Sequence, residues 1–122
     1  MTNNDSISVA SITLDGVDNL VFMLNDNLPW EQLDKTDFIE EKQHLLLLQD
    51  SINECISYIQ NEKHKKDYPN KNIRNAFVEI HFKYSFTEHC KRYLQLIHNQ
   101  LEQYGIKIEV YVGERISQNK VL

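Results

Sequence analysis

Residues 76–112 read AFVEIHFKYSFTEHCKRYLQLIHNQLEQYGIKIEVYV and decide the fold, because they hold a strand, a helix and a second strand in succession. Apolar and polar side chains alternate over residues 76–84 and again over 106–112, the period of a half-buried β-strand. Two strands joined by one helix form a right-handed crossover that leaves the strands parallel. This segment therefore predicts a parallel strand pair covered by a helix.

The helix between these strands has its own start and stop signals. Ser85 and Glu88 have the spacing of a capping box, and Gly105 stands where a helix commonly ends. The apolar residues between them repeat with helical spacing, which predicts one buried stripe. The stripe consists of Phe86, Cys90, Tyr93, Leu94, Ile97, Leu101 and Tyr104.

The chain begins with a predicted hairpin. Residues 7–14 and 20–24 are the two strands, and Asp15-Gly16 between them is a common turn pair, because glycine adopts positive φ without strain.

A long helix is predicted after the hairpin, over about residues 38–63. Asp37 and Glu40 fit a capping arrangement, and Pro69 prevents further continuation. The helix has one apolar stripe that consists of Phe38, Leu45, Leu48, Ile52, Ile56 and Ile59.

These elements predict an α+β fold in the order ββαβαβ. We expect a four-stranded mixed sheet with both amphipathic helices on one face, a two-layer sandwich. Residues 1–122 form one domain, with an ordered core at about 7–112 and flexible ends. The other sheet face is expected to carry Phe77, Glu79, His81, Lys83, Lys107, Glu109 and Tyr111.

Composition limits the class of partner. The formal net charge is −5, and the basic connector 61–74 holds too few cations for a nucleic-acid footprint. The apolar run 45–48 is far too short for a membrane span, and the N-terminus lacks a secretory signal. Cys55 and Cys90 fall on the apolar stripes, as reduced core thiols would. A cytoplasmic location is the expectation, with no contact to membrane or nucleic acid.

Four short stretches resemble a family of small bacterial proteins known only as a domain of unknown function. The resemblance extends over about residues 7–112, and it implies a bacterial origin without supplying an activity. The longer stretch between Trp30 and His44 departs from the family pattern. The stretches are MLNDNLPW at 23–30, HLLLLQDSINECISYI at 44–59, DYPN at 67–70 and VEIHFKY at 78–84.

Signatures of enzymes and metal sites are missing from the sequence. The 5 histidines include no helical i, i+4 pair, and neither CxxC nor HExxH occurs. With 3 glycines there is no glycine-rich phosphate loop. We therefore expect a protein that is not an enzyme, with no catalytic residues, no bound metal and no cofactor.

The leading hypothesis is a non-enzymatic protein-interaction module. An acidic segment surrounds the only tryptophan, and an exposed aromatic side chain ringed by carboxylates would suit a basic protein partner. An immunity-type or antitoxin-like protein is one concrete version; the open sheet face is another contact surface. The opposing interpretation is that the tryptophan plugs the edge between the layers. The candidate residues are Asp26, Trp30, Glu31, Asp34 and Asp37.

The alternative hypothesis is a homodimer that binds a small ligand. His44, Gln49 and Asn53 are candidate ligand-binding residues on the long helix, and the half-apolar sheet face would form the dimer interface. The opposing interpretation is that His44 packs beside Trp30 while the two amides satisfy nearby backbone groups.

Overall fold

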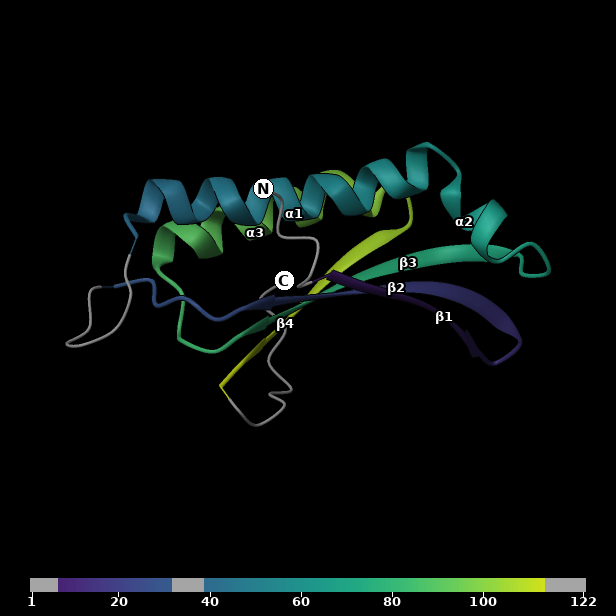
Figure 1. The fold of residues 1–122 in the computed structure, drawn as a ribbon, viewed down its shortest axis with the longest axis horizontal. Helices are drawn as coiled ribbons and strands as arrows, with labels where there is room; N and C mark the ends of the chain where they lie inside the picture. The colour runs from purple at the N-terminus through teal and green to yellow at the C-terminus, as the bar shows by residue number, and fades with distance from the viewer. Residues whose placement is uncertain (1–6, 32–38, 114–122) are drawn as a thin grey trace.

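The computed structural model describes residues 7–31 and 39–113. Its sheet has the strand order β1-β2-β3-β4, in which β1 is antiparallel to β2 while β2, β3 and β4 run parallel (Figure 1). The predicted mixed sheet is confirmed, and one short helix is added. The elements are β1 Ile7–Leu14, β2 Val17–Asp26, α1 Glu41–Gln60, α2 Lys63–Asp67, β3 Ile73–Phe82, α3 Glu88–Glu102 and β4 Ile106–Val112.

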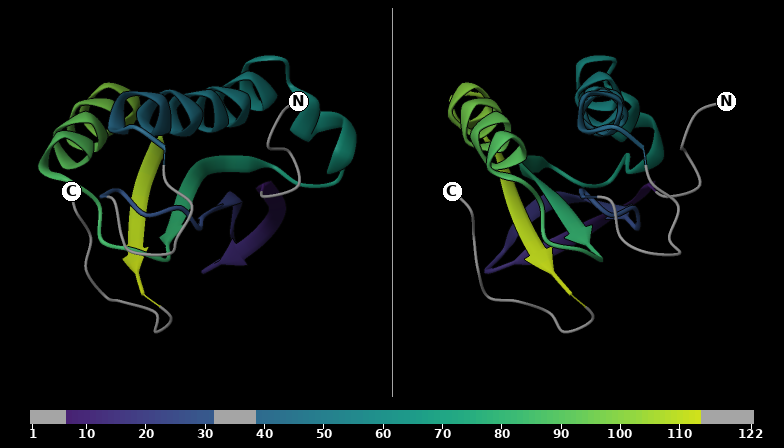
Figure 2. Two further views of the ribbon diagram at one scale, coloured as in Figure 1. Left: turned by 60° about the vertical axis from the view of Figure 1, so that its left-hand side comes forward. Right: turned by 90° about the vertical axis from the view of Figure 1, so that its left-hand side faces the viewer.

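Helices α1 and α3 lie side by side on one face of the sheet, which gives the predicted two layers (Figures 1 and 2). The core lies between these layers. It includes Phe22 and Leu24 from β2, Val78 and Ile80 from β3, and Ile52 from α1, all exposed by 3% or less. Alternate residues of each strand therefore point at the helices, as the period of two requires.

The hairpin forms where the sequence predicts it. Asp15 and Gly16 both have positive φ, 51° and 78°, and Leu14 pairs with Val17 across the turn. Positive φ at both central residues is the requirement of a type I′ turn. Strand β2 is longer than the predicted 20–24, because it pairs along its length with β1 on one side and β3 on the other.

The ends of α1 differ from the prediction. The helix begins at Glu41 after Glu40, whose side chain makes no capping hydrogen bond, and Asp37 lies outside the described residues. At the other end Glu62 adopts φ 58°, in the left-handed region. A left-handed residue ends a helix because it turns the following carbonyls out of line. The lysines after it consequently belong to the separate helix α2.

Helix α3 starts two residues later than the capping box predicted. Its N-cap is Thr87, whose hydroxyl accepts a hydrogen bond from the Cys90 amide at 3.2 Å, so the expected role of Ser85 is wrong. At the opposite end Gly105 has φ 76°, as expected of a helix-ending glycine, although the C-cap residue itself is Gln103.

Both cysteines are core residues, as predicted. Cys55 and Cys90 are free thiols with exposed fractions of 2% and 0%. Burial raises the pKa of Cys55 to about 12 and that of Cys90 further, because a thiolate is poorly solvated there. Neither thiol is therefore ionised at neutral pH.

Within residues 7–31 and 39–113, no helix combines the length and the apolar character needed to cross a membrane.

Candidate functional site

A buried, hydrogen-bonded histidine–aspartate pair joins the end of β2 to the first turn of α1. Nε2 of His44 lies 2.8 Å from Oδ1 and 2.7 Å from Oδ2 of Asp26. The His44 side chain is 3% exposed and the Asp26 side chain 10%. A pair with this geometry, shielded from water, interacts more strongly than a surface pair.

Asp26 is also fixed by its neighbours in the chain. Its Oδ1 accepts a hydrogen bond from the Leu28 amide at 3.2 Å, the pattern of an Asx turn. Its backbone carbonyl accepts from the amide of Lys83, just beyond β3, at 2.8 Å. His44 and the Leu28 amide therefore hold the carboxylate, and the Lys83 amide holds the backbone of the same residue.

Trp30 covers the imidazole of this pair. The two rings stack with centroids 3.5 Å apart at an interplanar angle of 10°, and the tryptophan is 2% exposed. Among the atoms that the structure describes, neither Nε1 of Trp30 nor Nδ1 of His44 has a hydrogen-bond partner. Buried polar atoms without partners are rare in proteins, and they often mark the place of a bound water, ion or ligand.

A cavity of about 210 Å³ adjoins the pair; we call it the Asp26 cavity. Strand β2 and the turn that follows it form one wall, and the first half of α1 forms the other. Its lining is Leu24, Asn25, Asp26, Asn27, Leu28, His44, Leu47, Leu48, Ser51 and Ile80.

Cys90, close to this site, does not have the environment of a nucleophilic cysteine. Cys90 is fully buried, and the negative charge of Asp26 adds to burial in raising the pKa of the thiol. A nucleophilic cysteine needs the opposite shift. The Nε2 atom of His44 is already occupied by the carboxylate. Among the described residues, no group of three or more His, Cys, Asp and Glu side chains could hold a metal ion.

The structure separates the predicted ligand-binding cluster. Gln49 and Asn53 are exposed, whereas His44 is buried. A helix turns by about 100° per residue, so positions five and nine residues beyond His44 point roughly 140° and 180° away from it. The polar partner of His44 is Asp26, from another element.

The predicted aromatic anchor is also wrong in its geometry. Trp30 is buried between the layers, as the opposing interpretation held, and Asp26 points into the site. Glu31 is exposed, and the remaining two candidates, Asp34 and Asp37, lie outside the described residues. The Asp-x-Leu-Pro turn was the sequence signal that could have identified Asp26 as inward-facing, since Asx turns fix such side chains.

The opposite side of the sheet, which we call the open face, carries no helix of the described chain (Figure 2). Strand register puts Ala10, Val21, Phe77 and Lys107 in one row across it. The predicted members are confirmed on this face, except that Lys83 lies just past the end of β3. The open face comprises Ser8, Ala10, Ile12, Leu14, Val17, Asn19, Val21, Met23, Asn25, Asn75, Phe77, Glu79, His81, Lys107, Glu109 and Tyr111.

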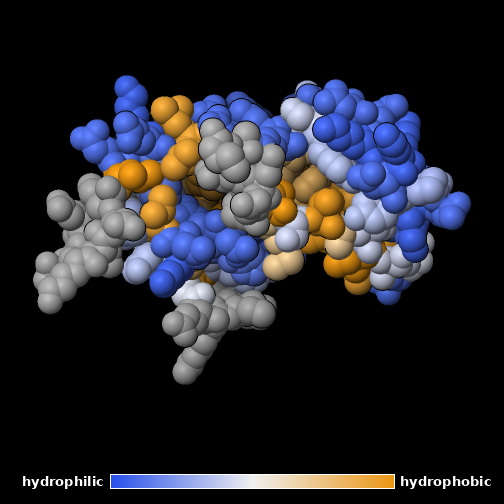
Figure 3. All heavy atoms as spheres, in the orientation of Figure 1, coloured by the Kyte–Doolittle hydropathy of each residue, from blue (hydrophilic) through white to orange (hydrophobic). Residues whose placement is uncertain are grey.

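The open face is apolar toward β1 and polar toward β4. Ile12, Leu14, Val17 and Met23 are exposed by 42%, 55%, 37% and 40%. Strand β1 contains no charged residue, and apolar side chains show at the surface along this side of the molecule (Figure 3). On the polar half, by contrast, the side chains contact one another. The rings of His81 and Tyr111 stack with their centroids 4.9 Å apart. The Tyr111 hydroxyl donates a hydrogen bond to the Glu109 carboxylate at 3.0 Å.

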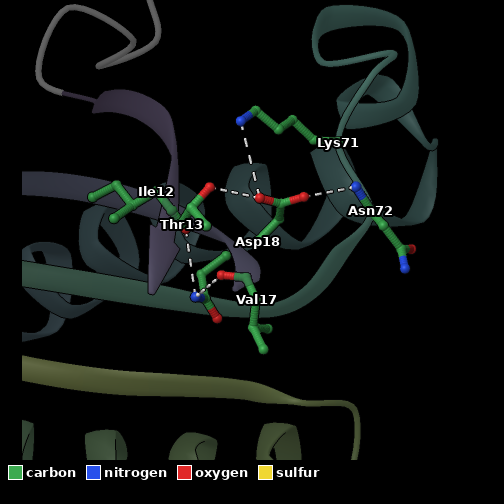
Figure 4. Close-up of polar contacts among 7 residues, drawn as sticks. Ile12, Thr13, Val17, Asp18, Lys71 and Asn72 are labelled. Atoms are coloured by element: carbon green, nitrogen blue, oxygen red, sulfur yellow. Dashed lines mark hydrogen bonds and ion pairs between the residues drawn. The ribbon is translucent and has the colours of Figure 1, made fainter. Parts of the chain in front are cut away.

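The basic connector is bound at the other end of β2. There Asp18 accepts hydrogen bonds from the Thr13 hydroxyl at 2.6 Å and the Asn72 amide at 3.0 Å, and Lys71 lies 4.0 Å away (Figure 4). These contacts, the Thr13 hydrogen bond first, hold the pKa of Asp18 below its ordinary value of 3.8. The connector is therefore attached to the hairpin through Asp18.

Comparisons with known proteins give one family. No curated protein and no solved structure matches the chain. The sequence matches a family of unknown function over residues 1–114, which is nearly its whole length. The expected membership of a domain family of unknown function is confirmed: the chain belongs to the family of unknown function DUF6572.

Proposed function

We propose that the protein is a non-enzymatic protein-interaction module that pairs with a second copy of itself through the open face. The observation that carries this proposal is the group of three exposed apolar side chains at the hairpin end of one sheet face, Ile12, Leu14 and Val17. Met23 is also exposed on this face but lies farther along β2, beyond the buried Asn19 and Val21. A contiguous exposed apolar surface commonly marks an interaction site. Removing such a surface from water contributes about 25 cal/mol of favourable free energy per Å².

The size of the face suits a weak dimer. Four strands spaced by ~4.8 Å and eight residues long give a flat area of roughly 500 Å². Side-chain relief enlarges this area toward the about 800 Å² per partner of a standard interface. Two such sheets pack face to face at about 10 Å, so a dimer would have sheets inside and helices outside.

Charge favours a second copy as the occupant. Lys107 and Glu109 lie at the polar side of the open face together with Glu79, so the face carries both signs. In a two-fold interface each residue meets another from the same surface, and mixed signs allow acids to meet bases. A uniformly basic partner would gain less from this face.

Oligomeric state tests the proposal. Light scattering after gel filtration should show a dimer at about 100 µM, a concentration suited to a micromolar complex. Leu14→Lys places a charge in the apolar group beside Val17 and should give a monomer. Leu96→Lys, at a position 56% exposed on α3, is the matched control and should remain dimeric. A wild-type monomer, or a dimer lost only in Leu96→Lys, would contradict the proposal.

We also infer a bacterial, cytoplasmic setting. The family resemblance supports the bacterial origin, and the two unpaired, buried thiols support a reducing compartment. Mass spectrometry of the protein isolated from its native cells, after rapid alkylation of denatured protein, should find both cysteines reduced.

A further inference from the structure

The Asp26 cavity has polar atoms on one side and hydrocarbon on the other. Leu24, Leu48 and Ile80 contribute apolar surface, and Leu47 stands at its rim with 38% exposure. The polar side includes Asp26, His44 and Ser51. A molecule that fits both sides needs a polar head and a short apolar body.

Asp26 offers unfilled acceptor positions toward the cavity, whereas the unpartnered Nε1 donor belongs to Trp30, which is not a lining residue. An ionised carboxylate accepts only, and its two oxygens offer about four lone-pair positions. Here His44 Nε2 and the Leu28 amide are the donors to Asp26, which leaves capacity for another donor. Nδ1 of His44, on the other side of the ring, has no hydrogen-bond partner among the described atoms.

We propose that the Asp26 cavity binds a small organic cation with N–H donors on a short alkyl chain, an alkylammonium or an alkylguanidinium group. The head would donate to the Asp26 carboxylate, and the methylenes would lie against the leucine and isoleucine side chains. Such groups bury their apolar stems while the charge stays hydrogen-bonded. The cavity is open to solvent on one side, and its volume of about 210 Å³ corresponds to roughly seven water molecules, so a head group with a few carbons can lie inside it.

The surrounding charge supports a cation. Glu40 and Glu41 lie at the start of α1, and Glu31 directly follows Trp30. The cations of this region are Lys42 in the first helical turn and Lys83, whose amide bonds the Asp26 carbonyl. A negative surrounding raises the local concentration of cations. Two sources present the same chemistry: a free amine, or the lysine or arginine side chain of a basic protein inserted into the cavity.

Trp30 provides the readout, because it is the only tryptophan and stacks on His44. Titration with n-butylammonium and n-butylguanidinium should change its fluorescence saturably, with matching shifts of the Asp26 and Ser51 amide signals in NMR spectra. The neutral 1-butanol and the anionic butyrate should produce no saturable change. The absence of saturation with both cations at roughly 50 mM, well above millimolar affinity, would overturn the proposal. Equal binding of 1-butanol would overturn it too.

Variants test the position of the site. Asp26→Asn removes the charge and should weaken binding of n-butylammonium at least tenfold. Ser51→Leu fills the cavity without altering Asp26 or His44 and should weaken binding similarly, so a folding defect of the first variant cannot decide the test. Asp50→Asn, an exposed acid on the same helix, should bind as the wild type does. Wild-type affinity in Ser51→Leu, or an equal loss in Asp50→Asn, would contradict the assignment.

A titration with a peptide distinguishes a free amine from a protein side chain as the natural ligand. The probe is a short glycine- and serine-rich peptide with one central lysine, compared with the same peptide acetylated on that lysine. Tighter binding of the lysine peptide than of n-butylammonium assigns the cavity to a protein side chain. The reverse order assigns it to a free amine. Equal binding of the acetylated and the unmodified peptide would show that the cavity does not recognise a cation, which overturns the proposal.

Discussion

Two aspartates lie at opposite ends of β2 and attach different segments to it. Asp26 is shielded from water and paired with an imidazole beneath Trp30, whereas Asp18 lies at the surface and binds a hydroxyl, an amide and, more distantly, Lys71. The same residue type thus holds a buried site at one end and a surface connector at the other. The comparison indicates that burial, more than the number of partners, decides how much such a contact contributes to the free energy of unfolding.

The largest effect is expected for His44→Ala. It leaves the Asp26 carboxylate without its buried partner and removes the ring that stacks on Trp30, so the free energy of unfolding should fall by about 3 kcal/mol. Denaturation in urea, followed by tryptophan fluorescence, measures this change. His89→Ala, which breaks an exposed contact to Glu41, is the control and should change it by less than about 0.5 kcal/mol. Similar losses in both variants would show that the buried pair is not special.

Charge removal at the two aspartates compares the ends of β2 directly. Asp26→Asn keeps the shape but weakens two charged hydrogen bonds, and we expect a loss of about 2 kcal/mol in the free energy of unfolding. Asp18→Asn should lose well under half as much, because solvent screens its contacts. Both are measured by the same urea denaturation. A larger loss of unfolding free energy in Asp18→Asn than in Asp26→Asn would contradict the idea that the buried contact contributes more.

The pKa of Asp18 tests which contact stabilises its carboxylate at the surface end of β2. Its lowered pKa means that its contribution to stability is fully present above pH 3.8 and is lost as the pH falls through the lower, folded value. Thr13→Val removes the hydroxyl donor and should move the pKa of Asp18 up toward 3.8. NMR titration of the side-chain carboxyl carbon measures the shift. An unchanged pKa in Thr13→Val would assign the lowering to Asn72 and Lys71 instead.

The smallest effect is expected for Lys71→Ala. The 4.0 Å separation of its ammonium group from Asp18, with the lysine side chain 45% exposed, gives an ion pair of little net value. Urea denaturation should not distinguish this variant from the wild type, and added salt should not change that result. A clear loss of stability would mean that the connector is held electrostatically and not by the Asn72 amide.

Much of the fold could be predicted from local patterns. Strand β4 and strand β1 match their predicted ranges, and the Asp15-Gly16 turn forms as expected, since alternation and turn residues are local properties. The helix ends were less predictable. Ser85 and Thr87 both have hydroxyls suited to a cap, and the position where the chain leaves β3 decides which one is used.

The candidate site was only half predictable. His44 was identified, and its packing against Trp30 was one of two open interpretations. Its pairing with Asp26 was not foreseen, because 18 residues separate the two in sequence. No periodic pattern links a strand end to a helix start, so this contact depends on how α1 is laid over the sheet.

The sequence by itself determined the four strands, the two long helices, the sides they bury and the family, but not the short helix α2. Periods of two and 3.6 residues specify which side chains must leave water, whatever the neighbours are. Only the tertiary structure decided that Trp30 is buried, that Asp26 meets His44, and that Gln49 and Asn53 face solvent. These outcomes depend on the placement of one layer on the other, because contacts between distant segments follow from packing and not from local periodicity.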